Sequence, residues 1–187
     1  MIRRKVLAET IPLLILWLFL SALLWSFVFN ILTSAKPGER LSLFIDAKVP
    51  DPTAMAVELE KDRPAGIRMV KVHPFSYAMM DDGSLSQADL YIMREDKLEQ
   101  YAVSLAPVPD VLRDGRELAL LDGTPIGIVI RFTDDEASDW IDYEPGRYVL
   151  AFGANGQHLP GNAGAVDDAA IRFADRVTEL VEQPRNK

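Results

Sequence analysis

The sequence contains no cysteine at all and has only two histidines among its 187 residues. Without cysteine there can be no disulfide, no thiol chemistry and no cysteine-ligated zinc site. A lipid-modified N-terminal cysteine is excluded as well, so the chain cannot be anchored as a lipoprotein. The two histidines, His73 and His158, are far apart and form no H-x-H or H-x-x-x-H spacing, so we expect no metal site.

Sequence motifs for catalysis are missing too. There is no G-x-S-x-G nucleophile turn and no G-x-x-x-x-G-K-S/T phosphate loop, and no internal repeat is present. We therefore expect no enzymatic activity and no cofactor. An envelope enzyme whose site has no recognisable motif remains an alternative.

The formal net charge is −8, and it is unevenly distributed. Residues 1–35 carry Arg3, Arg4, Lys5 and Glu9, so the remainder is more acidic than the whole. Because an acidic domain repels phosphate backbones and anionic lipid, we expect no nucleic-acid partner and a domain that stands off the bilayer.

One long apolar run begins at Ile11 and reaches Leu32 without a charged residue. A helix of about 22 residues rises about 33 Å, enough to cross a bilayer core of about 30 Å. We expect a membrane helix over residues 11–33, with Pro12 in its first turn. The basic residues in 1–10 would stay cytoplasmic by the positive-inside rule, so the rest would be extracytoplasmic at the plasma membrane. A signal peptide cleaved near Ala35 is the rival interpretation, disfavoured by the length of the run. The third interpretation of the apolar run is a buried core helix.

The remainder is expected to be a polar linker over 34–40, one α/β domain over 41–183 and a polar tail over 184–187. Strands are predicted at 41–45, 67–72, 88–93, 117–121, 124–132 and 147–152, and helices from Pro52 to about residue 63, at 95–105 and from a cap at Asp167 to Pro184. Asp122-Gly123 between two β-rich runs predicts a hairpin with a type I′ turn. This order predicts a three-layer domain with a mixed sheet that has a parallel part and a hairpin at one side.

Several short motifs occur in the order found in one protein family. They include the strand Ala88-Asp89-Leu90-Tyr91-Ile92, the helix from Leu98 to Val108 and the hairpin from Asp122 to Ile128. The strand at Tyr148 and the helix from Ala169 to Leu180 follow. This pattern resembles the first lobe of the extracellular solute-binding proteins of carbohydrate ABC transporters.

The resemblance implies a periplasmic-binding-protein-like lobe, but only about 14 residues separate Phe152 from the last helix, which leaves no room for a second lobe. A single lobe cannot close over a ligand. The resemblance therefore implies an accessory or sensor protein beside a transporter permease or binding protein.

Ligands of open α/β sheets bind at the carboxyl ends of parallel strands, which here are followed by Asp46 and His73. A second candidate is the acidic stretch 134–144, where Trp140 and Tyr143 could stack on a sugar or form a protein contact. The acids there could also hold a weakly bound cation. These residues predict a small binding module for a sugar or cation as the alternative to an accessory role.

Overall fold

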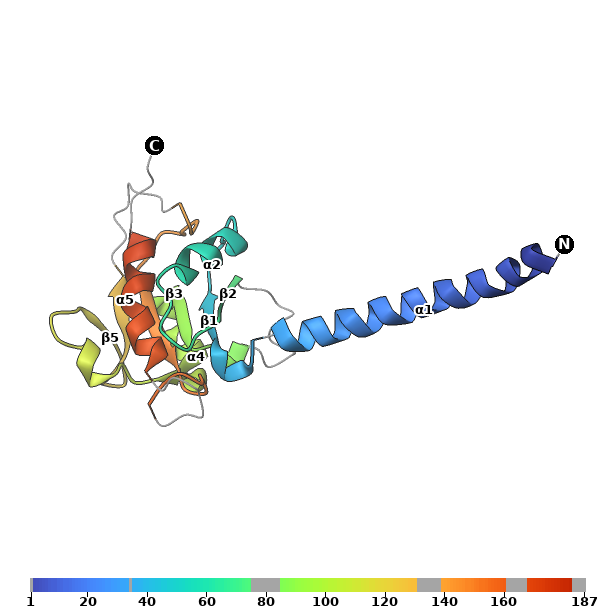
Figure 1. The fold of residues 1–187 in the computed structure, drawn as a ribbon. Helices are drawn as coiled ribbons and strands as arrows, with labels where there is room; N and C mark the ends of the chain where they lie inside the picture. The colour runs from blue at the N-terminus through green and yellow to red at the C-terminus, as the bar shows by residue number, and fades with distance from the viewer. Residues whose placement is uncertain (1, 34, 75–84, 131–138, 161–167, 183–187) are drawn as a thin grey trace. The chain divides into compact units, whose positions relative to one another are not determined.

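The computed structural model describes residues 2–33, 35–74, 85–130, 139–160 and 168–182 (Figure 1). The chain divides into two compact units, Met1–Ala35 and Lys36–Lys187, and each is described by itself. The predicted helix cap at Asp167 and the tail 184–187 lie outside the described residues.

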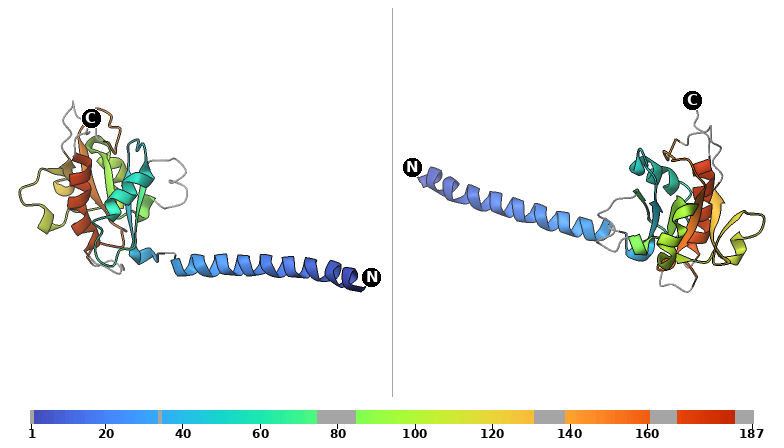
Figure 2. Two further views of the ribbon diagram at one scale, coloured as in Figure 1. Left: turned by 45° about the horizontal axis from the view of Figure 1, so that its top comes forward. Right: turned by 180° about the vertical axis from the view of Figure 1, so that it is seen from behind.

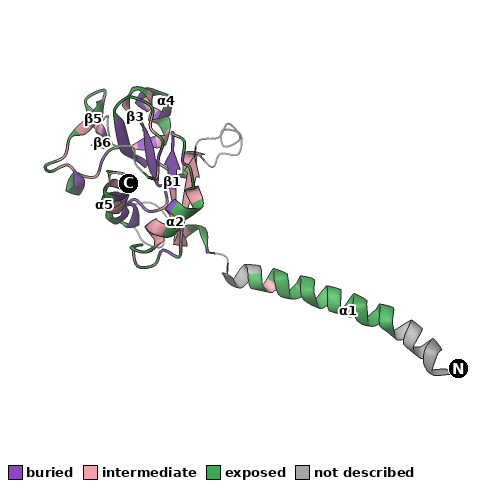
Figure 3. Ribbon diagram, turned by 90° about the horizontal axis from the view of Figure 1, so that it is seen from above, coloured by how far each residue is buried: buried purple, intermediate pink, exposed green. Residues whose placement is uncertain are grey.

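The first unit is the helix α1, Ile2–Thr33. Its stretch Ile11–Phe29 has a mean hydropathy of 2.3, so this helix is long and apolar enough to cross a membrane. Most of its described stretch is exposed (green in Figure 3). Its tryptophans are well exposed, with Trp17 at 65% and Trp25 at 71%. The prediction for Pro12 was wrong. Because the helix already begins at Ile2, Pro12 lies in its interior, where it removes one backbone hydrogen bond.

The second unit contains one mixed sheet. Its strands are β1 (Arg40–Ile45), β2 (Met69–Pro74), β3 (Leu90–Arg94), β4 (Leu105–Ala106), β5 (Leu118–Leu121), β6 (Thr124–Ile130) and β7 (Tyr148–Gly153). They lie in the order β2-β1-β3-β7-β6-β5, and β4 pairs with β7. The pairs β2-β1 and β1-β3 are parallel, whereas β3-β7, β7-β6 and β6-β5 are antiparallel. The predicted mixed sheet is confirmed, although β2 starts two residues later than expected.

The helical elements of this unit are mostly short. They are η1 (Pro37–Glu39), α2 (Pro52–Glu60), η2 (Leu85–Gln87), η3 (Glu95–Lys97), α4 (Leu98–Tyr101), η4 (Ala102–Ser104), η5 (Asp110–Leu112) and α5 (Ala169–Glu182), where η marks a 3₁₀ turn. The helix α2 begins as predicted, because the Asp51 carboxylate accepts a hydrogen bond of 2.8 Å from the Ala54 amide and Pro52 occupies the first turn.

The predicted helix over 95–105 is only partly present. Only α4 is α-helical, with the 3₁₀ turns η3 and η4 on either side. Leu105 leaves the helical path to pair with Gly153 as β4. Pro107 follows, and the residue before a proline is pushed toward extended backbone, so the chain turns into a strand there.

Apolar side chains cover both faces of the sheet. On one face, Leu41, Leu43 and Ile45 of β1 belong to a core cluster with buried residues of α2 and α5. On the other face, Phe44 belongs to a cluster with Tyr91 of β3 and with Leu98 and Tyr101 of α4. The central strands β1 and β3 are accordingly buried (purple in Figure 3), and Figure 2 shows α5 lying along the sheet.

The predicted hairpin joins β5 to β6. Both turn residues have a left-handed backbone, with φ of 50° at Asp122 and 79° at Gly123, as a type I′ turn requires. In the strand order the hairpin follows β7 and ends the sheet with β5, so its predicted place at one side of the sheet is confirmed.

A buried carboxylate ties the segment after β7 to the start of the sheet. Asp89, 2% exposed, accepts a hydrogen bond of 2.8 Å from the Ser42 amide and one of 3.2 Å from the His158 amide. Two glycines allow the backbone after β7 to come this close to Ala88 and Asp89. A Cβ on Gly153 would lie 1.9 Å from the Ala88 carbonyl oxygen, and one on Gly156 would lie 2.8 Å from the Asp89 Cα.

Candidate functional site

A pocket of about 800 Å³ lies at the carboxyl edge of the parallel strands, and we call it the edge pocket. Asp46, directly after β1, forms one part of its wall, while Lys97 and Tyr101 come from the η3–α4 segment that follows β3. Tyr148 reaches it from the first position of β7, which pairs with the last residue of β3. The pocket thus lies where the sheet changes from parallel to antiparallel pairing.

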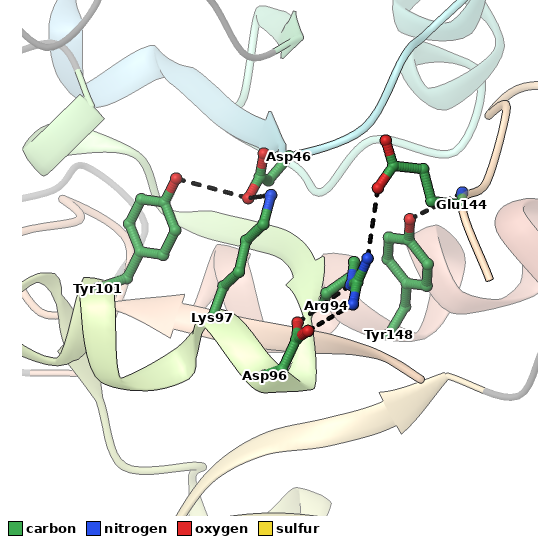
Figure 4. A network of polar contacts seen from close by, with 7 residues as sticks. All are labelled: Asp46, Arg94, Asp96, Lys97, Tyr101, Glu144 and Tyr148. Carbon is green, nitrogen blue, oxygen red and sulfur yellow. Dashed lines mark hydrogen bonds and ion pairs between the residues drawn. The ribbon is translucent and has the colours of Figure 1, made fainter. Parts of the chain in front are cut away.

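The edge pocket contains an ion pair between a nearly buried carboxylate and a partly exposed ammonium (Figure 4). The Asp46 side chain is 6% exposed, and its Oδ2 atom lies 2.8 Å from the Nζ atom of Lys97, whose side chain is 37% exposed. The Tyr101 hydroxyl donates a longer hydrogen bond of 3.5 Å to the same oxygen. The Asp46 amide donates to the Ile92 carbonyl at 2.7 Å, so the backbone next to this carboxylate is fixed to β3.

Tyr101 stays a neutral hydrogen-bond donor over a wide pH range. Burial, the negative charge of Asp46 and the hydrogen bond to that carboxylate raise the pKa of Tyr101 to about 12. Its ring packs near Phe44, with 6.2 Å between ring centroids, which fixes the hydroxyl on the Asp46 side of the pocket.

A second cluster of polar side chains lies beside this ion pair in Figure 4. Arg94, at the end of β3, binds the Asp96 carboxylate through two of its nitrogens and the Glu144 carboxylate at 3.3 Å. The Tyr148 hydroxyl accepts a hydrogen bond of 3.1 Å from the Glu144 amide. These contacts hold the 142–144 segment over the edge of the sheet.

That segment closes the side of the pocket opposite α4. The amide of Asp142 donates to the Lys48 carbonyl at 2.8 Å, and the two side chains form an ion pair of 2.9 Å. The Tyr143 hydroxyl donates to the Val181 carbonyl of α5 at 3.2 Å. The Tyr143 ring packs edge-to-face on Tyr148, so the partly exposed Tyr143 has a fixed orientation in the wall.

The structure places the four predicted site residues in different surroundings. Asp46 and Tyr143 both line the edge pocket. His73 does not, although β1 and β2 run parallel as expected, because it pairs with Phe44, two residues before Asp46, and lines a separate pocket. Trp140 is half-buried against the core cluster that contains α5. Asp46 and His73 therefore line different pockets, and a ligand role for either residue stays a prediction.

Lys97, Gln100 and Tyr101 were missed as pocket residues. Tyr101 is also a core residue, at 5% exposure. A polar pair at positions 97 and 100, on the helix that directly follows a buried parallel strand, was the available signal. Helices after such strands begin at the ligand-binding edge.

Metal binding receives no support from the described part of the chain, where no three His, Asp or Glu side chains gather in ligand geometry. His158 is fully buried, and its Nε2 atom donates to the Arg40 carbonyl at 2.8 Å. Residues 134–138 of the predicted cation stretch lie outside the described residues.

The fold is thus a mixed α/β domain in a chain that also carries a helix able to span a membrane. No family model, curated protein or solved structure matches the chain.

Proposed function

We propose that this chain is a membrane-tethered domain that binds a small neutral polar molecule, of the sugar or polyol class, in the edge pocket. The observation that carries the proposal is the pocket itself. Its volume of about 800 Å³ is in the range of small-molecule sites, and it lies where open α/β sheets bind ligands.

The charges of the pocket favour a neutral ligand. Each of its three carboxylates already has a cation: Asp46 has Lys97, Asp142 has Lys48 and Glu144 has Arg94. A charged ligand would have to displace one of these partners, whereas hydroxyl groups can add hydrogen bonds to paired charges. Tyr143 provides an aromatic surface against which the apolar face of a sugar ring can pack.

The tether supports a role at a membrane surface. Arg3, Arg4 and Lys5 precede the apolar stretch of α1, which favours a cytoplasmic N-terminus and an extracytoplasmic domain at the plasma membrane. The three-layer arrangement, the likeness to one lobe of a solute-binding protein and an accessory role beside a carbohydrate ABC transporter stay predictions. So does the absence of enzymatic activity.

Binding can be tested on the full chain in a polyoxyethylene detergent, which contains neither sugar nor phosphate. A panel of neutral monosaccharides, disaccharides and polyols is screened for an increase in the melting temperature, because a ligand that binds only the folded state stabilises it by mass action. At least one compound is expected to stabilise the chain in a saturable way.

Two neighbouring residues of α4 provide a matched pair of variants. Gln100 is exposed and lines the edge pocket, whereas Glu99 is exposed outside it. Gln100→Ala is expected to weaken binding of the stabilising compound, and Glu99→Ala is expected to leave this binding unchanged. Equal binding by both variants, or no stabilisation by any compound, would refute the proposal.

A further inference from the structure

A second, smaller pocket lies on the face of the sheet that carries Phe44, and it is lined by basic side chains from two adjacent strands. We call it the basic pocket. It has a volume of about 250 Å³, and its walls include Arg40 and Ser42 of β1, Lys71 and His73 of β2, and Gln87 and Asp89.

Strand register brings the basic side chains together. β1 and β2 are parallel, with Ser42 paired to Lys71 and Phe44 paired to His73. Side chains two positions apart on a strand share a face, so Arg40, Lys71 and His73 all project to the same side of the sheet. Arg40 and Lys71 are diagonal neighbours there, within reach of a single anion.

Neither Arg40 nor Lys71 has an ion-pair partner among the described residues, and the Nε atom of Arg40 is buried without a hydrogen bond. Most other basic side chains in the described part of the second unit do have a carboxylate partner, such as Arg94, Arg116 and Arg176. In so acidic a domain, two adjacent cations without partners are an exception.

The one acid in this pocket does not neutralise them. Both carboxylate oxygens of Asp89 accept backbone hydrogen bonds, from the amides of Ser42 and His158. Burial raises the pKa of Asp89 above its ordinary value.

We infer that the basic pocket is a binding site for a phosphate group, held by the Arg40 guanidinium and the Lys71 ammonium, with the Ser42 hydroxyl and the Gln87 amide as neutral partners. Arginine presents a fork of donors that suits phosphate oxygens, and lysine adds a point charge. The pocket suits a single phosphate group rather than a larger ligand. The overall acidity is compatible with this site, because charges farther away than about 8–10 Å are largely screened at physiological salt.

Two sources can supply such a group. One is a soluble phosphate ester, and the other is a phospholipid headgroup, since Arg40 follows Thr33, the last residue of α1, by only seven positions in the sequence. The site does not depend on the proposed function of the edge pocket.

The test uses the full chain in polyoxyethylene micelles. Inorganic phosphate is titrated calorimetrically, first alone and then with phosphatidic acid or uncharged diacylglycerol added to the micelles. We expect saturable phosphate binding that Arg40→Gln and Lys71→Gln each weaken by about tenfold, the loss of one charge-assisted contact. Arg172→Gln removes the same charge from α5, which packs on the opposite face, and should have no effect.

The titrations with added lipid identify the source of the phosphate group. Competition by phosphatidic acid but not by diacylglycerol supports a headgroup ligand, and the absence of competition supports a soluble ester. Lack of saturable binding of both phosphate and phosphatidic acid would overturn the inference, as would binding that neither Arg40→Gln nor Lys71→Gln weakens. Melting curves establish that each variant is folded. If Arg40→Gln does not fold, Lys71→Gln alone provides the test.

Discussion

The Nζ atom of Lys97 lies 2.8 Å from the Oδ2 atom of Asp46, and the two side chains differ sharply in exposure, at 37% and 6%. This pair joins the segment after β3 to the end of β1 and forms part of the wall of the edge pocket. Its asymmetry has a measurable consequence, because removing one partner leaves the other in very different surroundings.

Lys97→Met should destabilise the fold by about 1–2 kcal/mol, because it leaves a nearly buried carboxylate without its cation. Asp46→Asn should cost less, since Lys97 can extend into water. The control is Lys48→Met: its pair with Asp142 is exposed, at 79% and 46%, and should contribute less than about 0.5 kcal/mol. Urea unfolding followed by circular dichroism measures all three. Equal losses for Lys97→Met and Lys48→Met would contradict this description of the pair.

Asp89 should make stability fall as pH rises. Burial raises the pKa of this carboxyl in the folded state above the ordinary value of 3.8, so between the two values the folded chain binds more protons than the unfolded chain. The contribution of Asp89 to the free energy of unfolding therefore decreases with increasing pH across that window and is constant above it. Asp89→Asn cannot titrate and lacks this contribution.

The measurement is the difference in unfolding free energy between the natural chain and Asp89→Asn, from pH 3.8 upward. A difference that grows in favour of the natural chain as pH rises would contradict the raised pKa. The variant should also be about 1–3 kcal/mol less stable near neutral pH, because its amide group presents a donor to either the Ser42 or the His158 amide.

Gly153→Ala tests the close approach at the end of β7. The added Cβ would lie 1.9 Å from the Ala88 carbonyl oxygen, so the backbone must move, and we expect a loss of about 3 kcal/mol or more. Gly123→Ala is the matched control. Its Cβ meets nothing within 4 Å but the backbone has a φ of +79°, so only the conformational cost of about 1–2 kcal/mol is expected. A smaller loss at Gly153 than at Gly123 would be inconsistent with the observed packing.

The orientation of the tether can be measured because the chain has no cysteine. Val103 is 95% exposed, so Val103→Cys gives one accessible thiol in the domain. A membrane-impermeant maleimide should label it in right-side-out vesicles but not in sealed inside-out vesicles. The reverse pattern would place the domain in the cytoplasm, and loss of the label into the soluble fraction would indicate cleavage after α1.

Much of the fold could be predicted from local patterns. Asp51-Pro52 is sufficient to start α2, and Asp122-Gly123 is sufficient to turn the hairpin, because both act through their own backbone and nearest neighbours. The prediction of a helix over 95–105 failed because the structure there depends on a contact between distant residues. The pairing of Leu105 with Gly153 joins residues 48 positions apart, which periodicity cannot show.

The candidate site was predictable only in part. Asp46 could be placed at the edge of the sheet because it follows a parallel strand. The partnership of Asp46 with Lys97, and of Glu144 with Arg94, depends on how distant segments cross that edge. His73 was assigned to the same site because strand ends coincide, but the pocket it lines is decided by its pairing with Phe44.

The most direct test of the central claim compares one neutral sugar with two charged relatives. The best compound from the stabilisation screen is titrated calorimetrically into the full chain, beside its amino-sugar and uronic-acid analogues. Because the carboxylates of the edge pocket are already paired, we predict that the neutral sugar binds most tightly and that Gln100→Ala weakens it. Tighter binding of either charged analogue, or no saturable binding of the neutral sugar, would contradict a neutral-ligand pocket at this edge.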